Sequence, residues 1–334
     1  MSVDPIIQPR SRPPDAGPRG PYAIEQVNAA IALGYGTSRR RASQPRAAAF
    51  LRLARPRQWP KNVLVFAAPA AAGALLDPVV MLRASLAALA FCVASSATYF
   101  LNDSLDAPSD RRHARKCLRP IAAGVITPRE GLLASAAMFL LAIGVPVMAG
   151  APLLAAVIAT YALCQVAYSL RLKRLAIVEM LLVASGFVLR MIAGGVAVDI
   201  PLSRWFVVVT LFASLLIVVG KRLSEFVSLG PERASHRAVL ERYSLRALLG
   251  IGAACAAVAV IAYIGWALHS AGSTGATALY YATIPPFVAG IGTYLLLAYR
   301  AAADAPEELL YGHRSMQLIA AAWATTFMLA VYVH

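Results

Sequence analysis

The sequence predicts an all-α polytopic membrane protein with about nine transmembrane helices. Of its 334 residues, 59% are hydrophobic and only 14% are charged, which is too apolar for an ordinary soluble domain. Apolar runs recur at close to the length of about 20 residues that spans a bilayer. Lys and Arg concentrate in alternate loops between these runs, as expected for a chain that crosses a membrane repeatedly.

The first 45 residues precede these runs and are rich in Pro, Arg, Gly and Ala. They contain neither an apolar core nor the hydrophobic region of a signal peptide. The sequence therefore predicts a disordered cytosolic tail over 1–45 and a transmembrane domain over 46–334. Near the start of this domain, Trp59 and the Arg residues around it suit the headgroup level of an anionic bilayer.

Nine apolar runs are candidate spans, and Pro69, Gly73 and Asp77 interrupt the first of them. The chain carries 31 Lys and Arg against 16 Asp and Glu. Most of these cations lie before the first run and after the even-numbered runs, which places the N-terminus in the cytoplasm and explains the positive charge without nucleic acid. The runs lie at residues 63–81, 84–101, 131–149, 152–170, 175–197, 205–221, 247–268, 279–299 and 316–333.

The densest charge follows the second run, in the sequence YFLNDSLDAPSDRRHARKCLRPIAAG at 99–124. On a helix, Asn102, Asp106 and Asp110 fall at i, i+4 and i+8, with Asp103 one step round. Unpaired carboxylates on one face repel, and oxygen ligands favour a hard ion such as Mg²⁺, whose remaining ligands are water and substrate phosphates. The stretch therefore predicts a magnesium site for a diphosphate substrate.

The cations behind the aspartates have two explanations. In a solvated loop, the aspartates would pair with Arg111 or Arg115. Alternatively, Lys116 and Arg119 lie over the aspartates, because PIAAG at 120–124 turns the chain back toward the membrane.

Further Lys and Arg residues lie at the ends of the fourth and sixth predicted spans, on the predicted cytoplasmic side. YSLRLKR occupies 168–174 and GKRLSEF occupies 220–226. Lys221 and Glu225 lie at i and i+4 and could form an ordinary surface pair. That pair does not explain why cation-rich helix ends recur on one face.

The fifth run contains two ionisable residues, Glu179 and Arg190, eleven positions apart and nearly on one helical face. Such groups at membrane depth usually face a polar cavity or a partner. Glu179 is expected near the cytoplasmic entrance. For Arg190, contact with a ligand and an ion pair with another helix both stay open.

These motifs resemble those of UbiA-type intramembrane prenyltransferases over residues 50–334, and within that superfamily the branch that uses a phosphoribosyl donor. The resemblance implies nine helices around a central cavity, polar chemistry at the cytoplasmic mouth, a polyprenyl chain in a lateral apolar groove and a homo-oligomer. It rests on RPRQWPKN at 55–62, NDSLDAPSD at 102–110, KCLRPIAAG at 116–124, YSLRLK at 168–173, GFVLRMIAGG at 186–195 and GKRLSEF at 220–226.

The resemblance implies Mg²⁺-dependent transfer of 5-phosphoribosyl from phosphoribosyl pyrophosphate to a polyprenyl (decaprenyl) phosphate, in the synthesis of a lipid-linked arabinose donor for cell-wall arabinan. It implies a bacterial inner membrane with a cytoplasmic active site. Asp103, Asp106 and Asp110 would be catalytic and, with Asn102, would bind the metal. The substrate-binding residues implied are Lys61, Asn62, Lys116, Arg119, Tyr168, Lys173, Glu179, Arg190, Lys221, Arg222 and Glu225.

Two other functions are weighed against this one. The first is aromatic prenyl transfer in quinone biosynthesis, but aromatic members carry a second aspartate cluster where this chain has Lys221, Arg222 and Glu225. The second is a transporter with charged residues lining a path, but the chain lacks the inverted repeats that many transporters show. His313 stands where the family pattern has an acidic residue, so the role of the last loop stays open.

Overall fold

The computed structural model describes residues 45–113, 115–229, 243–274, 277–300 and 312–333. The tail predicted over 1–45 therefore lies almost entirely outside the described residues. Residues 50–334 form one compact unit, and the fold described below is the fold of this unit.

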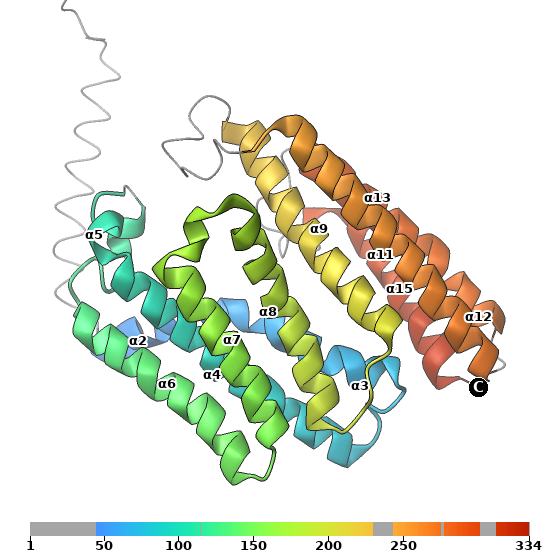
Figure 1. The fold of residues 1–334 in the computed structure, drawn as a ribbon, viewed down its shortest axis with the longest axis horizontal. Coiled ribbons are helices and arrows are strands. Elements are labelled where there is room, and N and C mark those ends of the chain that lie inside the picture. The colour runs from blue at the N-terminus through green and yellow to red at the C-terminus, as the bar shows by residue number, and fades with distance from the viewer. Residues whose placement is uncertain (1–44, 114, 230–242, 275–276, 301–311, 334) are drawn as a thin grey trace, which may run out of the picture. The chain divides into compact units, whose positions relative to one another are not determined.

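The described residues form helices and no strands, as the predicted all-α class requires (Figure 1). Short 3₁₀ turns, named η, join some of the α-helices. In chain order the elements are α2 (Arg46–Ala54), η1 (Pro56–Phe66), α3 (Ala67–Ala71), α4 (Pro78–Leu105), α5 (Ala107–Asp110), η2 (Lys116–Leu118), α6 (Pro128–Met148), α7 (Pro152–Leu170), η3 (Leu172–Arg174), α8 (Ala176–Ala197), α9 (Arg204–Leu229), α11 (Leu245–Thr274), α12 (Thr277–Ala282), α13 (Ile284–Tyr299) and α15 (Arg314–Tyr332).

Eight helical segments within the described residues are long and apolar enough to cross a bilayer. They correspond to the second to ninth predicted runs, with α12 and α13 together forming one of them. The membrane fold is thus confirmed, and "about nine" is an approximation because the first run is not one continuous helix.

The first predicted run is broken into η1, α3 and a turn. Pro60 lies inside η1, and Gly73 has φ +70°, which removes it from a right-handed helix. The segment nevertheless runs antiparallel along α4, because Trp59 donates to Ser96 Oγ at 3.1 Å and Asn62 donates to Cys92 Sγ at 3.1 Å. The segment therefore packs in the same bundle as the long helices, although it is not one continuous helix.

Local capping fixes where the helices beside this segment begin. Asp77 Oδ1 accepts from the backbone N–H groups of Val79 and Val80 and so starts α4 at Pro78. Thr127 and Glu130 form a reciprocal capping box at the start of α6. The long connection between α4 and α6, where the charge of the chain is densest, therefore has defined ends.

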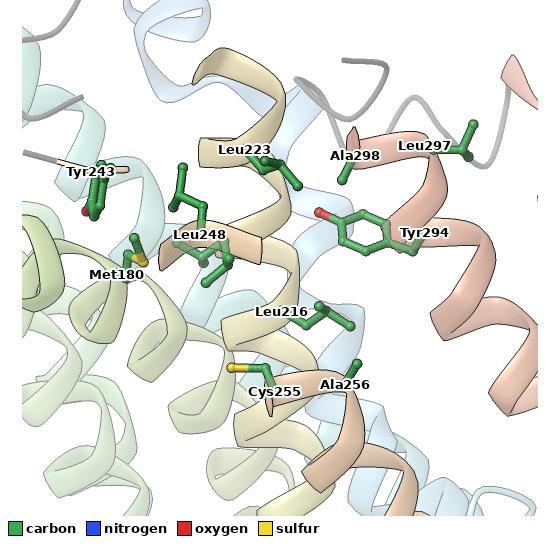
Figure 2. Close-up of a cluster of buried hydrophobic side chains, with 12 residues drawn as sticks. Met180, Leu216, Leu223, Tyr243, Leu248, Cys255, Ala256, Tyr294, Leu297 and Ala298 are labelled. Carbon is green, nitrogen blue, oxygen red and sulfur yellow. The ribbon is translucent and has the colours of Figure 1, made fainter. Parts of the chain in front are cut away.

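Helix packing brings the polar helix ends together. α4 packs against α6, α7 and α8, while α9 packs against α8, α11 and α13. Figure 2 shows the apolar cluster in which α8, α9, α11 and α13 meet, with Met180 facing Leu248 and the side chain of Tyr294 reaching toward α9. A Cβ on Gly194 would lie 1.8 Å from the Val65 carbonyl oxygen, so only glycine allows η1 to lie this close to α8.

Candidate active site

The backbone at the end of α4 keeps the polar residues of the charged stretch in helical register. Asp106 N–H donates to the Asn102 carbonyl at 2.9 Å, and Asp110 N–H donates to the Asp106 carbonyl at 2.8 Å. α4 ends at Leu105, but α5 continues in nearly the same conformation to Asp110. The predicted i, i+4, i+8 spacing therefore survives a one-residue break at Asp106.

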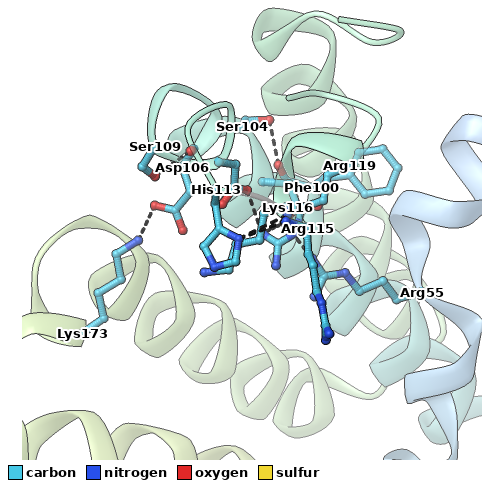
Figure 3. A network of polar contacts seen from close by, with 12 residues as sticks. Arg55, Phe100, Ser104, Asp106, Ser109, His113, Arg115, Lys116, Arg119 and Lys173 are labelled. Atoms are coloured by element: carbon cyan, nitrogen blue, oxygen red, sulfur yellow. Dashed lines mark hydrogen bonds and ion pairs between the residues drawn. The ribbon is translucent and has the colours of Figure 1, made fainter. Parts of the chain in front are cut away.

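Each of the three aspartates is paired with a cation from elsewhere in the chain. Arg119 Nη1 lies 3.0 Å from Asp103 Oδ1 and 2.7 Å from Asp110 Oδ2, so one guanidinium nitrogen bridges two carboxylates. Lys173, in η3, reaches across to Asp106 Oδ1 at 2.5 Å (Figure 3). The sequence predicts Arg119 over the aspartates as one of two explanations, and it predicts Lys173 as a site residue without indicating its partner.

A third cation, Arg55, was missed as a site residue. Its Nη2 lies 2.7 Å from Asp103 Oδ1, the same oxygen that Arg119 contacts. Its guanidinium carbon lies 4.5 Å from the centre of the Tyr99 ring, a cation–π distance. The signal available in the sequence is its place in RPRQWPKN, one of the motifs that carry the family resemblance, from which only Lys61 and Asn62 are predicted as site residues. Asp103, Asp106, Asp110, Arg55, Arg119 and Lys173 are called the aspartate cluster below.

The predicted alternative, in which the aspartates pair with Arg111 or Arg115, is not what this part of the chain shows. Arg111 Nε donates to the Ala122 carbonyl at 3.4 Å. His113 Nδ1 accepts from the backbone N–H groups of Arg115 and Lys116, which closes a local turn. Lys116 lies in the same loop (Figure 3), and it makes no ion pair among the described residues.

The oxygen atoms at the end of α4 fit a magnesium ion by their chemistry. Asn102 Oδ1 is buried and accepts no hydrogen bond within the described residues, and the Asp106 side chain is 35% exposed. With the cations in their present positions, no three His, Cys, Asp or Glu side chains of the described residues gather closely enough to hold a metal ion. An ion would therefore have to draw carboxylates away from Arg119 or Lys173.

A second charged group links α8 to α9. Arg222 Nε lies 2.8 Å from Glu179 Oε1, and Arg222 also pairs with Glu225. Glu179 is completely buried, and Arg222 is nearly so. Lys221, next along α9, is half-buried. The structure thus places Arg222 between two carboxylates, so the buried Glu179 carboxylate has a cationic partner although it is removed from solvent.

Arg190 lies deeper, about 16 Å from Glu179 along α8 at 1.5 Å per residue. It donates to Asn62 Oδ1 at 2.7 Å, to the Gly186 carbonyl at 2.5 Å and to the Tyr161 hydroxyl at 3.4 Å. It forms no ion pair with a carboxylate among the described residues, so neutral acceptors and aromatic faces solvate its charge. The rings within 6.0 Å of its guanidinium carbon belong to Phe91, Tyr161 and Phe187.

The remaining predicted site residues are Lys61 and Tyr168, both half-buried. An apolar pocket of about 230 Å³ lies between α9, α13 and α15, away from these polar groups. Its wall is almost entirely apolar, a composition suited to a hydrocarbon chain. It is lined by Ala213, Leu216, Ile217, Pro286, Phe287, Gly290, Ile291, Tyr294, Met316, Ile319, Ala320 and Trp323.

Residues 63–307 match the model of the UbiA prenyltransferase family. The chain is 40% identical over 285 residues to the decaprenyl-phosphate phosphoribosyltransferase of Mycobacterium tuberculosis, covering 83% of this chain and 92% of the relative. It is 37% identical over 288 residues to the protein of the same name from Corynebacterium glutamicum, covering 84% and 85%.

Solved structures share the fold at lower sequence identity. A UbiA homolog from Archaeoglobus fulgidus bound to GPP and Mg²⁺ superposes with a TM-score of 0.62 at 18% identity, covering 86% of this chain and all of that one. A digeranylgeranylglyceryl phosphate synthase gives 0.60 at 16% identity, covering 86% and 99%.

Proposed function

Since the chain belongs to the UbiA prenyltransferase family, we propose that it is an integral membrane transferase that moves 5-phosphoribosyl from phosphoribosyl pyrophosphate to a polyprenyl phosphate such as decaprenyl phosphate, releasing pyrophosphate. One observation carries the choice of substrates: relatives named for this reaction match the chain at up to 40% identity over most of their length. The aspartate cluster supports the choice, because it combines carboxylates with cations of the kind that bind phosphates.

We assign the pyrophosphate end of the donor to the aspartate cluster. Asn102, Asp106 and Asp110 supply the oxygen atoms that would hold Mg²⁺, which when bound would neutralise charge on the departing pyrophosphate. Arg119 and Lys173 would bind the diphosphate oxygens directly by charge-assisted hydrogen bonds. The C1 carbon of the ribose thus passes through an oxocarbenium-like state while its leaving group is held by cations.

The acceptor needs no strong general base in this scheme. A phosphate monoester has a second pKa of about 6 and is largely ionised at neutral pH. His113 is the histidine nearest to the aspartates in sequence, and its Nδ1 is occupied by backbone N–H groups. The polyprenyl phosphate can therefore attack as the dianion.

The donor 5-phosphate and the acceptor isoprenoid chain, which do not react, are assigned to sites outside the aspartate cluster. Lys221 and Arg222 would face the 5-phosphate of the donor, with Glu179 and Glu225 orienting the Arg222 guanidinium. That group has five N–H donors, more than these two contacts use. The isoprenoid chain of the acceptor is assigned to the pocket between α9, α13 and α15.

We assign the aspartate cluster to the cytoplasmic side of a bacterial inner membrane, where a soluble donor is within reach; the distribution of Lys and Arg along the sequence supports this assignment. Assembly as a homo-oligomer and a role in arabinan synthesis stay predictions. Aromatic prenyl transfer is disfavoured by the residues near the end of α9. Aromatic members carry a second aspartate cluster there, whereas this chain has Lys221, Arg222 and Glu225.

Pyrophosphate release by purified protein in lipid nanodiscs tests the proposal. Release should require phosphoribosyl pyrophosphate, decaprenyl phosphate and Mg²⁺ together, and omission of any one should abolish it. Release from a prenyl diphosphate in the presence of an aromatic acid would instead assign the chain to aromatic prenyl transfer.

A further inference from the structure

We propose that the cations of the aspartate cluster make the site bind a divalent metal and a diphosphate together rather than the metal alone, and that Arg55 is a positioning residue for this coupling. The inference rests on the proposed function, because it takes the donor diphosphate as the ligand. It goes further in assigning a role to Arg55 and in predicting how the site behaves with metal alone.

The charge balance of the aspartate cluster opposes the binding of a metal ion alone. Asp103, Asp106 and Asp110 contribute three negative charges, and Arg55, Arg119 and Lys173 contribute three positive charges at 2.5–3.0 Å from them. The cluster is therefore formally neutral without a ligand. A divalent ion entering alone would add two positive charges beside three existing cations, and the repulsion between like charges would oppose its binding.

A diphosphate reverses this balance. Its negative charges attract the guanidinium and ammonium groups, so the cations can turn from the carboxylates to the phosphate oxygens while the carboxylates turn to the metal. Each ligand thereby removes the main obstacle to the other. Such coupling is reciprocal: the metal must strengthen diphosphate binding by the same factor as the diphosphate strengthens metal binding.

Arg55 is the cation best placed to exchange partners. Arg119 bridges two aspartates, whereas Arg55 pairs with one aspartate of the described residues, Asp103, through an oxygen that Arg119 also contacts. Its departure therefore leaves the buried Asp103 carboxylate still paired. The Arg55 side chain is 31% exposed, while that of Asp103 is 2% exposed, so Arg55 can reach a ligand at the open side of the cluster.

The backbone holds Arg55 in an unusual conformation at this point. Its φ of 52° and ψ of 60° are left-handed, a region that non-glycine residues adopt rarely. The residue joins α2 to η1, and its guanidinium stacks on Tyr99. Backbone strain at a residue that pairs with a buried carboxylate is typical of a functional constraint rather than of a free surface arginine.

Manganese binding measured by electron paramagnetic resonance tests the inference without turnover. Mn²⁺ replaces Mg²⁺, and inorganic pyrophosphate replaces the donor. In the wild-type protein, pyrophosphate should raise the affinity for Mn²⁺ by about 10-fold or more, within the usual range of coupling between two sites. In Arg55→Ala, Mn²⁺ alone should bind about 3- to 10-fold more tightly, and the gain from pyrophosphate should shrink, because one opposing cation is gone.

Two further variants separate charge from backbone effects. Arg57→Ala removes an exposed cation two residues away and should behave like the wild type. Arg55→Gly removes the side chain while adopting positive φ readily, so it should fold well and match Arg55→Ala in both measurements.

The inference is overturned if Arg55→Ala and Arg55→Gly bind Mn²⁺ with the affinity and the pyrophosphate gain of Arg57→Ala. It is equally overturned if their metal affinity falls. These results are independent of the acceptor. If phosphoribosyl pyrophosphate and decaprenyl phosphate give no product, the proposed function fails whatever the Mn²⁺ data show.

Discussion

Lys173 Nζ lies 2.5 Å from Asp106 Oδ1, and this ion pair joins two segments 67 residues apart. Both side chains are partly exposed, so the pair contributes little to the stability of the fold, typically about 0–1 kcal/mol. The pair is better explained by a role in catalysis, because it holds the Lys173 ammonium beside the carboxylate assigned to the metal.

Lys173→Ala should therefore lower kcat/KM for phosphoribosyl pyrophosphate by about 10-fold or more, as expected for one charge-assisted hydrogen bond of roughly 1.5–3 kcal/mol. The melting temperature should change little. Arg171→Ala is the matched control, because Arg171 is an exposed cation in the same loop. Equal kinetics in the two variants would remove Lys173 from the donor site.

Asp106→Asn and Asp110→Asn should each abolish most activity while leaving the protein folded. Asn keeps the side-chain shape but lacks the charge that the metal requires, and Arg119 keeps Asp103 as a partner when Asp110 is replaced. Asp199→Asn is the control, because Asp199 is 83% exposed and pairs with Arg83 away from the site. Ordinary turnover of either site variant at normal Mg²⁺ would refute the metal assignment.

Arg222→Met should destabilise the protein strongly, by roughly 3–5 kcal/mol, because it removes one partner of the buried ion pair between Arg222 and Glu179. The double variant Glu179→Gln with Arg222→Met should recover much of the loss. Thermal unfolding in detergent measures both effects. If Arg222 were only a contact for the donor, the single variant would instead melt normally and show a raised KM for the donor.

Gly290→Leu should raise the KM for polyprenyl phosphate several-fold and leave the KM for the donor unchanged. The new side chain would fill part of the pocket, where a Cβ meets only Ile319 at 3.5 Å. Gly292→Leu, on the same helix but outside the pocket, serves as control, because a Cβ there meets no described atom within 4 Å apart from its own stretch of helix. A shift in the donor KM would show that this pocket does not take the isoprenoid chain.

Much of the fold could be predicted from the sequence, because apolar length and charge asymmetry directly report bilayer crossing. The second run, predicted over 84–101, is α4 at Pro78–Leu105. Its C-terminal end extends further because Asn102 and Asp103, which a hydropathy argument excludes, continue the helix. Its N-terminal end extends further because the cap at Asp77 starts the helix within residues that the prediction gave to the first run. The first run was harder to interpret. Its residues are apolar, but the 3₁₀ segment η1 ends at Phe66 and the left-handed Gly73 follows the end of α3, so no single helix spans the run.

The candidate site also contains residues that the sequence predicts and contacts that it does not. Asn102, Asp106 and Asp110 could be found because their spacing is local. Arg119 could be placed near them because it follows in the same stretch. The pairing of Asp103 with Arg55 could not be predicted, because Arg55 lies 48 residues away and its cationic side chain resembles the many others that set membrane topology. Arg222 was expected beside a substrate, but its pairing with Glu179 depends on how α8 and α9 pack, which sequence spacing does not reveal.

The mass of the lipid product tests the proposed reaction most directly. Purified protein with decaprenyl phosphate, Mg²⁺ and isotopically labelled phosphoribosyl pyrophosphate should yield a labelled lipid heavier than the acceptor by one phosphoribosyl group, and Asp106→Asn should yield none. If folded protein leaves the mass of the lipid unchanged, the proposed reaction is contradicted.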